Sequence, residues 1–399
     1  MKSAIPSSVG IVVAIAWLGV STPVFAQETR EALLAAAQAE KAKDLHPYVP
    51  TTPERRIETI KNAFMAPSAF YPFIGGVFPG GWMGLGPGYR ARFAEGGTFD
   101  VHGAWSIKNY KTVDSTVVLP PFAGGRMQAD FRANWLDAPK VAFFGVGNDS
   151  PRNARTSFLY RTTTFGGSLR VLPASFFAVG GGVDALDVTT GAGTAGTSIE
   201  RRFTPADTAG LTANPTYIRT RAFAEIDWRE SPGYTRSGGL YRLTWSDYHQ
   251  RNTGPYSFRR VDGEVDQFVP LLRENWVLAM RALVSTTVTD DGNAVPYFLM
   301  PDLGGSSRLR GYPSWRFRDR NRMLLTGEYR WMAGQFVDMA LFLDAGKVAP
   351  RRTDLDFTQL KTSYGVGVRF HMPSATLLRV EVARTGEGTA LVFGFGPVF

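Results

Sequence analysis

The sequence predicts an all-β protein, namely a transmembrane antiparallel β-barrel of about sixteen strands with a short N-terminal helical segment. Apolar and polar residues alternate with period 2 over most of the chain from residue 69 to Phe399. Aromatic and turn-forming residues are abundant, with 28 Phe, 14 Tyr, 9 Trp, 43 Gly and 25 Pro. Beyond the N-terminus no apolar run reaches the roughly 18 residues of a membrane-spanning helix, which excludes a polytopic helical membrane protein.

Residues 1–26 have the pattern of a cleaved secretory signal peptide. Lys2 supplies the positive start, residues 9–20 form the apolar core, and a small-residue cleavage site ends at Ala26. A membrane anchor would need about 20 apolar residues and a stop-transfer flank. We therefore expect the mature protein to be exported. Residues 27–68 are expected to be a short periplasmic segment that acts as a tether or a lumen-facing plug, with helices over 28–44 and 53–64.

Residues 69–399 are expected to form the outer-membrane barrel. In residues 98–108, for example, Phe99 and Trp105 fall on one face of the predicted strand, while Asp100 falls on the other. Later segments repeat this division between an apolar and a charged face. A barrel with lipid outside and water inside explains the alternation and also explains the aromatic residues near strand ends.

The alternation sets the bounds of the individual strands. The predicted strands are 69–78, 82–93, 98–108, 111–120, 126–136, 156–172, 174–187, 216–229, 234–248, 256–268, 275–287, 322–332, 336–348, 362–372, 376–384 and 389–399. Short connections are predicted at 95–97, 123–125 and 231–233, and longer ones at 137–155, 188–215, 288–321 and 349–361. Short periplasmic turns that alternate with long outer loops are typical of such barrels.

The composition argues against several functions. The chain has no Cys, which excludes disulfides, Cys-ligated zinc, iron–sulfur clusters and thiol nucleophiles. Its net charge is +9, but the basic residues are scattered, so we expect no nucleic-acid partner. The four His residues lack metal-like spacing, and His102 and His371 are predicted to line the lumen. We therefore expect no catalytic residue, no metal, no cofactor and no enzyme activity.

Motifs in a fixed order carry a family resemblance. Loop 301–321 contains the sequence Leu-Arg-Gly-Tyr at Leu309–Tyr312, and a later strand contains the pattern F-x-D-x-G at Phe342–Gly346. The chain ends on the aromatic Phe399, and the segment Phe143–Ser150 is similar to a common surface-antigen segment. In these motifs the chain resembles the outer-membrane assembly and translocation superfamily, which includes BamA, TamA, the two-partner secretion transporters and the bacterial surface antigen family.

The residues around the Arg-Gly-Tyr triplet predict a loop latch inside the barrel. Arg310 is followed by Gly311, which permits a tight backbone, and by Tyr312, which can wedge against the wall. Glu328 and Asp344 fall on the lumen faces of their predicted strands, so an inward loop could pair Arg310 with Asp344 and with Glu328. The alternative is a solvated arginine in a flexible outer loop. The resemblance implies that the matching Arg and Asp are the latch residues.

The family resemblance implies a function in the Gram-negative outer membrane. Many members carry periplasmic POTRA repeats before the barrel, and residues 27–68 are too few for one, so a barrel-only member is expected. We expect the protein to assist insertion or translocation of polypeptides into or across the outer membrane. The alternative is a passive or ligand-selective pore. Expected partners are outer-membrane lipids and lipopolysaccharide, together with unfolded polypeptide substrates or a separate periplasmic partner.

A lateral seam is predicted where the first and last strands meet. The predicted seam residues are Gly75, Gly76, Gly394, Gly396 and Phe399. Glycines add backbone freedom and nearby prolines remove ladder donors, so few closing hydrogen bonds are expected and the wall could open sideways. Phe393, Phe395 and Phe399 are expected on the lipid-facing side, where they would anchor the edge. The alternative is that these residues merely close a tight barrel end.

Overall fold

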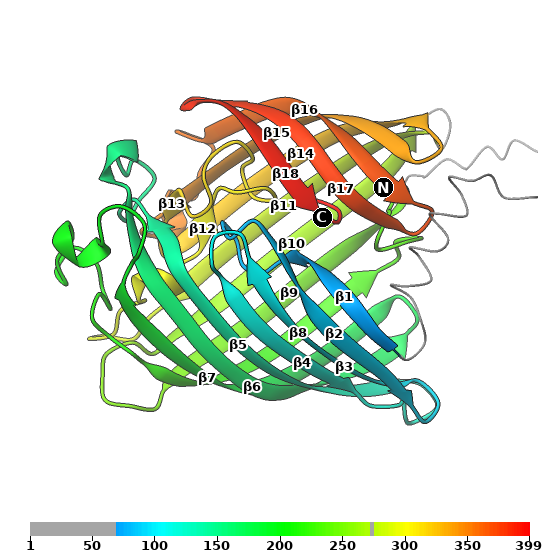
Figure 1. Cartoon of the computed structure of the whole chain (residues 1–399), viewed down its shortest axis with the longest axis horizontal. Helices are drawn as coiled ribbons and strands as arrows, with labels where there is room; N and C mark the ends of the chain where they lie inside the picture. Colours follow the sequence, from blue (N-terminus) through cyan, green and yellow to red (C-terminus); the bar gives the residue numbers. More distant parts are fainter. Residues whose placement is uncertain (1–68, 272–274) are drawn as a thin grey trace, which may run out of the picture. The chain divides into compact units, whose positions relative to one another are not determined.

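The computed structural model describes residues 69–271 and 275–399, which form one antiparallel sheet of sixteen strands curled into a nearly closed barrel (Figure 1). Each of these strands pairs with the next one in the chain, so the sheet is an up-and-down meander. Its strands are β1 Ala69–Gly76, β2 Met83–Phe93, β3 Gly97–Ser106, β4 Lys111–Val118, β5 Met127–Phe143, β6 Thr156–Ala174, β7 Phe177–Ala192, β8 Thr216–Asp227, β9 Gly238–Gln250, β10 Phe258–Leu271, β11 Trp276–Val288, β14 Asn321–Gly334, β15 Val337–Ala349, β16 Lys361–Met372, β17 Ala375–Thr385 and β18 Gly388–Phe395.

Short elements decorate the long loops. Strands β12 (Asp302–Leu303) and β13 (Phe317–Arg318) pair with each other in a separate small sheet. The 3₁₀ helices are η1 Arg152–Ala154, η2 Ile199–Arg201, η3 Tyr297–Leu299 and η4 Arg352–Asp354. No helix in the described part of the chain is long and apolar enough to cross a membrane.

The predicted barrel of sixteen strands is confirmed, with differences at particular ends. Strand β5 continues to Phe143 instead of ending near residue 136, and β18 ends at Phe395 instead of continuing to Phe399. Strands β12 and β13 were not predicted, because two residues are too few to show an alternation. The predicted signal peptide and helical segment fall within residues 1–68, outside the described residues.

The alternation of side chains separates an apolar outer surface from a polar lumen. In β15, Leu341 and Leu343 are 50% and 54% exposed on the outside, whereas Phe342 and Asp344 are buried on the inside. Exposed aromatic residues gather near both ends of the strands, as expected where a membrane meets water. Examples are Trp82, Trp105 and Tyr364 at the end with the long loops, and Trp228, Trp276 and Phe370 at the end with the short turns.

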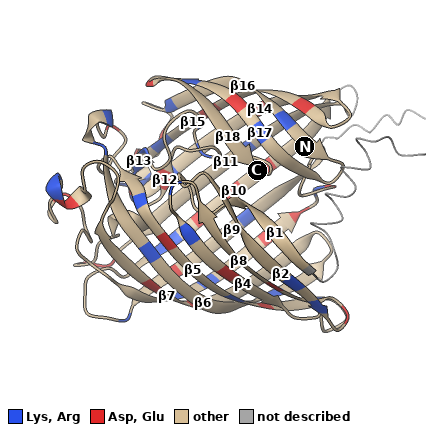
Figure 2. Ribbon diagram, viewed as in Figure 1, with Lys and Arg blue, Asp and Glu red and all other residues tan. Residues whose placement is uncertain are grey.

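Residues of opposite charge occur on neighbouring strands of the barrel wall (Figure 2), and several of them form ion pairs. Asp114 on β4 accepts from Arg132 on β5 at 2.6 Å, and Asp184 on β7 accepts from Arg219 on β8 at 2.8 Å. Asp184 directly faces Arg219, where opposite side chains start about 5 Å apart, and Asp114 lies diagonally from Arg132, within reach of its long side chain. The lumen wall of β4–β8 is therefore polar but largely charge-compensated.

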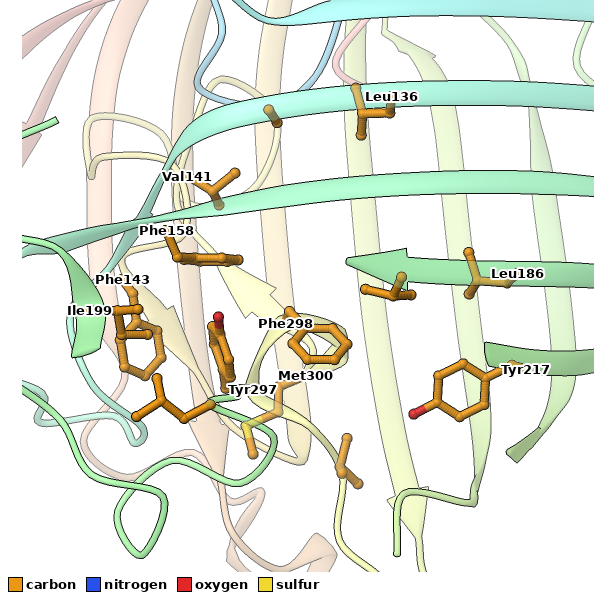
Figure 3. Close-up of a cluster of buried hydrophobic side chains, with 14 of the residues drawn as sticks. Leu136, Val141, Phe143, Phe158, Leu186, Ile199, Tyr217, Tyr297, Phe298 and Met300 are labelled. Carbon is orange, nitrogen blue, oxygen red and sulfur yellow. The ribbon is translucent and has the colours of Figure 1, made fainter. Parts of the chain in front are cut away.

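The long loops pack into a buried apolar cluster at their end of the barrel (Figure 3). Tyr297 of η3 makes edge contacts with Phe143 of β5 and Phe158 of β6, at ring-centroid distances of 5.2 and 4.8 Å. Ile199 of η2 and Phe298 of η3 belong to the same cluster. Segments from three separate loops and the wall thus share one core at this end, which fixes the base of the loop between β11 and β14.

Candidate functional site

The loop between β11 and β14 enters the lumen and is anchored there by apolar contacts. The pairing of β12 with β13 brings the two ends of this loop together, and β12 lies against β14 and β15. Leu303 and Leu309 of the loop pack with Leu324 of β14 and Val348 of β15 in a buried cluster. Leu309 has a positive φ of 61°, which bends the backbone at the point where Arg310 turns toward the wall. These contacts give the Arg-Gly-Tyr triplet a fixed position.

Arg310 lies at the centre of a buried ion network. Its guanidinium donates to both carboxylate oxygens of Asp344, with Nε–Oδ2 at 2.9 Å and Nη2–Oδ1 at 2.7 Å. Nη1 donates to Glu328 at 2.5 Å and to Glu381 at 3.0 Å, and the Arg310 backbone N–H also donates to Asp344. The guanidinium carbon lies 3.6 Å from the ring centroid of Phe342. Burial alone would lower the pKa of Arg310, but the carboxylates of Glu328 and Asp344 raise it above its ordinary value, so the group stays charged.

Gly311 and Tyr312 dock the same loop on β17. Gly311 has a φ of 84°, and a Cβ built there would lie 2.7 Å from Cβ of Ala383 and 2.8 Å from Cγ2 of Thr385. Both the conformation and the space therefore require glycine. Tyr312 is buried and packs edge-on against Phe317. The triplet is thus held by β14 and β15 on one side and by β17, the strand next to the barrel edge, on the other.

The network extends beyond the residues that the sequence singled out. Glu328 also accepts from Arg330 and Arg369, at 2.7 Å each. Glu381 on β17 joins Arg310 to Arg379, whose Nη1 donates to it at 2.9 Å. Sequence reasoning missed Glu381, although it alternates with Val380 and Val382 and so falls on the lumen face. The sequence therefore predicts that Glu381 faces the lumen, but it does not show that β17 brings this carboxylate to Arg310.

In the part of the chain that the structure describes, β1 and β18 form no ladder that would close the wall. Within residues 69–271 and 275–399, β1 is an outer member of the sheet next to β2, and β18 is the other outer member next to β17 (Figure 1). Gly75 and Gly76 pair with β2, and Gly394 pairs with β17. Trp82, after β1, lies 6.3 Å from Phe393 of β18 between ring centroids. The two edges therefore approach each other through side chains.

Phe399 does not face lipid, and the expectation that it anchors the edge from outside is wrong. Phe393 and Phe395 are 48% and 43% exposed on the outer surface, as expected, but Phe399 is only 8% exposed. The chain turns at Gly396, whose φ is 71°, and brings Val398 and Phe399 into an apolar cluster on the lumen side of β10 and β11. The positive φ of Gly396 ends the alternation of side chains, so extending the period-2 pattern beyond Phe395 assigns Phe399 to the wrong face.

Two arginines join this C-terminal tail, residues 396–399, to the lumen loop. Arg379 donates through Nε to the carbonyl of Gly396 at 2.9 Å and through Nη1 to the carbonyl of Ser306 at 3.3 Å. Arg281 on β11 donates through Nη1 to the carbonyl of Val398 at 3.3 Å. Tail and loop are therefore attached to the same side chain at Arg379, which also belongs to the Arg310 network through Glu381.

The fold and this loop define a class of membrane barrel, namely a sixteen-stranded barrel whose lumen holds an Arg-Gly-Tyr loop on charged wall residues. The model of the Omp85 superfamily domain matches residues 97–396, and the chain belongs to this superfamily. A search of curated proteins finds no significant match.

Solved structures show the same fold at low sequence identity. BamA from Haemophilus ducreyi lacking POTRA domains 1–3 is similar with a TM-score of 0.61 and 14% identity, over 83% of this chain and 69% of that one. CdiB from Escherichia coli is similar with a TM-score of 0.54 and 14% identity, over 83% of this chain and 60% of that one. CdiB from Acinetobacter baumannii is similar with a TM-score of 0.50 and 10% identity, over 86% of this chain and 68% of that one. These structures confirm the fold, and the superfamily match over residues 97–396 confirms the predicted family resemblance.

Proposed function

We propose that this protein assists the insertion or translocation of polypeptides at the outer membrane of a Gram-negative cell, and that the seam between β1 and β18 is where it acts. The observation that carries the proposal is the pair of outer strands with no ladder between them in the described residues. An unpaired strand edge presents backbone N–H and C=O groups that an incoming strand can bind by β-augmentation. The membership in the Omp85 superfamily and the similarity in fold to BamA and CdiB support this proposal.

The Arg310 network is the proposed loop latch. A guanidinium held by Asp344, Glu328 and Glu381 fixes the loop to β14, β15 and β17 at once. Because these groups are buried, separating them leaves uncompensated charge, so the loop has one strongly favoured position. A fixed loop beside β17 would keep the last hairpin in register while a substrate strand approaches the edge. Unfolded polypeptides, outer-membrane lipids and lipopolysaccharide, and a separate periplasmic partner are the proposed partners.

A pore is the second candidate, and the space inside the barrel favours it. Cavities of about 290 and 310 Å³ lie along β4–β9 and share Arg132, Asn134, Thr164 and Arg219 in their walls. Polar walls in which acidic and basic residues balance each other are typical of a water-filled channel. Against conduction, the apolar loop cluster packs at the end with the long loops.

Depletion of the protein separates the two functions. If it handles polypeptides, cells depleted of it accumulate unassembled or unsecreted outer-membrane polypeptides, seen as protease-sensitive or non-heat-modifiable species, while uptake of small solutes is unchanged. If it is a pore, small-solute uptake falls and the assembly of other outer-membrane proteins is unaffected. The second result contradicts the proposed function.

A further inference from the structure

The two edge hairpins of the barrel end in turns that lie near the lumen loop. The β1–β2 turn covers residues 77–82, and the β17–β18 turn consists of Gly386 and Glu387. Both turns are at the end of the barrel with the long loops, and no backbone ladder between β1 and β18 holds them together in the part of the chain that the structure describes. The two edges meet through the rings of Trp82 and Phe393, and any further alignment at this end must come from other segments.

Trp315 of the lumen loop holds the β1–β2 turn. Its indole Nε1–H donates to the carbonyl of Pro79 at 2.9 Å, and its ring stacks on Phe78 with centroids 5.2 Å apart and planes 27° apart. Trp315 has a positive φ of 65°, an uncommon backbone conformation for a bulky residue that surrounding contacts must maintain. The guanidinium of the buried Arg318 lies 4.5 Å from the Trp315 ring centroid and supports the ring.

The next residue, Arg316, holds the β17–β18 turn. Its Nε donates to Glu387 Oε1 at 2.8 Å, and its Nη2 lies 2.7 Å from the same oxygen. Nη1 and Nη2 also donate to the side chain and the carbonyl of Ser150 in the β5–β6 loop, at 2.9 and 2.7 Å. Arg316 is only 3% exposed, so this ion pair is shielded from screening by solvent.

Adjacent residues of one loop therefore contact the two turns that border the seam. We propose that Trp315 and Arg316 are positioning residues, here named the clasp, which hold the first and last hairpins together from inside the barrel. The clasp then resists widening of the seam at this end, and release of either turn favours widening. The clasp differs from the latch, since Arg310 binds the wall strands β14, β15 and β17, whereas Trp315 and Arg316 bind the two turns. A role of the clasp in admitting a polypeptide rests on the proposed function, whereas the positioning of the hairpins does not.

A distance measurement across the seam tests the clasp without any substrate. Leu85 of β2 and Leu391 of β18 are 54% and 58% exposed on the outer surface, and the chain has no Cys of its own. The protein carrying Leu85→Cys and Leu391→Cys is spin-labelled in lipid, and the distance distribution is recorded by pulsed electron resonance. Trp315→Phe removes the indole donor but keeps a ring, Arg316→Ala removes the ion pair, and the double variant removes both. Each is expected to add a population at longer distance, which is largest in the double variant.

Matched controls separate the clasp from general loosening. Trp105→Phe alters an outward Trp that is 63% exposed, and Arg351→Ala alters an exposed arginine that pairs with Asp354 within its own loop. Both are expected to leave the distribution unchanged, and a heat-dependent gel shift verifies folding of every variant. If Arg316→Ala does not fold, Trp315→Phe and Arg316→Lys are compared instead. An unchanged distribution in the clasp variants, or equal broadening in the controls, overturns the proposal. Because no substrate is present, this result is independent of whether the protein handles polypeptides.

Discussion

At the scale of single residues, the latch depends on charge that is buried and fully partnered. Arg310 is 0% exposed, and its carboxylate partners Glu328, Asp344 and Glu381 are equally enclosed. Burying ions costs free energy, and mutual attraction with good hydrogen-bond geometry offsets that cost only while every partner is present. Removal of one member is therefore far more harmful than the loss of an exposed pair.

The first prediction concerns the pair of Arg310 and Asp344. Arg310→Ala and Asp344→Ala should each lower the free energy of unfolding by about 3–5 kcal/mol, and the double variant should be little worse than either single one. Arg259→Ala is the control, because Arg259 and its partner Asp290 are 45% and 75% exposed, and it should cost under about 1 kcal/mol. Urea unfolding of the barrel in detergent micelles measures all four. Additive losses would mean that Arg310 and Asp344 do not act as a pair.

The second prediction concerns Gly311. Gly311→Ala combines strain at positive φ with a collision against Ala383, so it should displace the loop and destabilise the barrel by more than the roughly 1–3 kcal/mol of backbone strain. Gly124→Ala has a similar φ of 71° with no atom within 4 Å, and so it isolates the backbone term. Equal destabilisation of the two variants in the same urea assay would show that contact with β17 is unimportant.

At the scale of elements, the C-terminal tail and the lumen loop share their attachment points. Arg379 contacts Gly396, Ser306 and Glu381, so the end of β18 is attached to the loop as well as to β17. The guanidinium of Arg330 lies 5.1 Å from the ring centroid of Phe399. The last residues thus act as an internal anchor for the edge strand.

The third prediction is that loss of the anchor releases the tail. A single Val398→Cys should be protected from a water-soluble maleimide in the otherwise native chain, because Val398 is 6% exposed. Adding Arg379→Ala should make the thiol react faster, since its bonds to Gly396 and Ser306 are lost. Arg384→Ala, an exposed change on the same strand whose side chain contacts Thr389, is the control. Fast labelling of Val398→Cys in the otherwise native chain, or equal acceleration of labelling by Arg379→Ala and Arg384→Ala, would rule out anchoring by Arg379.

Local pattern predicted the elements well and their long-range contacts poorly. The period-2 alternation placed β14 and β15 nearly at their observed bounds, because lipid and water on opposite faces impose it at each position. The alternation predicted lumen faces for Glu328 and Asp344, and the motif indicated that a loop folded inward would bring Arg310 to them. It could not supply Glu381 or the contact of Trp315 with Pro79, because nothing in the sequence relates segments that meet only after the barrel curls.

At the scale of the whole molecule, the fourth prediction is that the protein is a heat-modifiable barrel. Its sixteen barrel strands form one sheet in which neighbouring strands satisfy each other's backbone hydrogen bonds, except along the outer edges of β1 and β18. Unboiled protein should therefore migrate differently from boiled protein in detergent gels, and circular dichroism should show a β spectrum. A predominantly helical spectrum would contradict the fold.

The proposed function requires the seam between β1 and β18 to open, so a cross-link that locks the seam should abolish it. Cysteines introduced as Trp82→Cys and Phe393→Cys replace two rings that meet across the seam, and a short bifunctional maleimide joins them. The control pair Leu343→Cys and Tyr364→Cys joins β15 to β16, which are already paired at those residues. Assembly or secretion is then measured in cells that depend on the variant chain. We predict that cross-linking abolishes function in the seam pair and spares it in the control pair, whereas undiminished function with a completely cross-linked seam would contradict the claim.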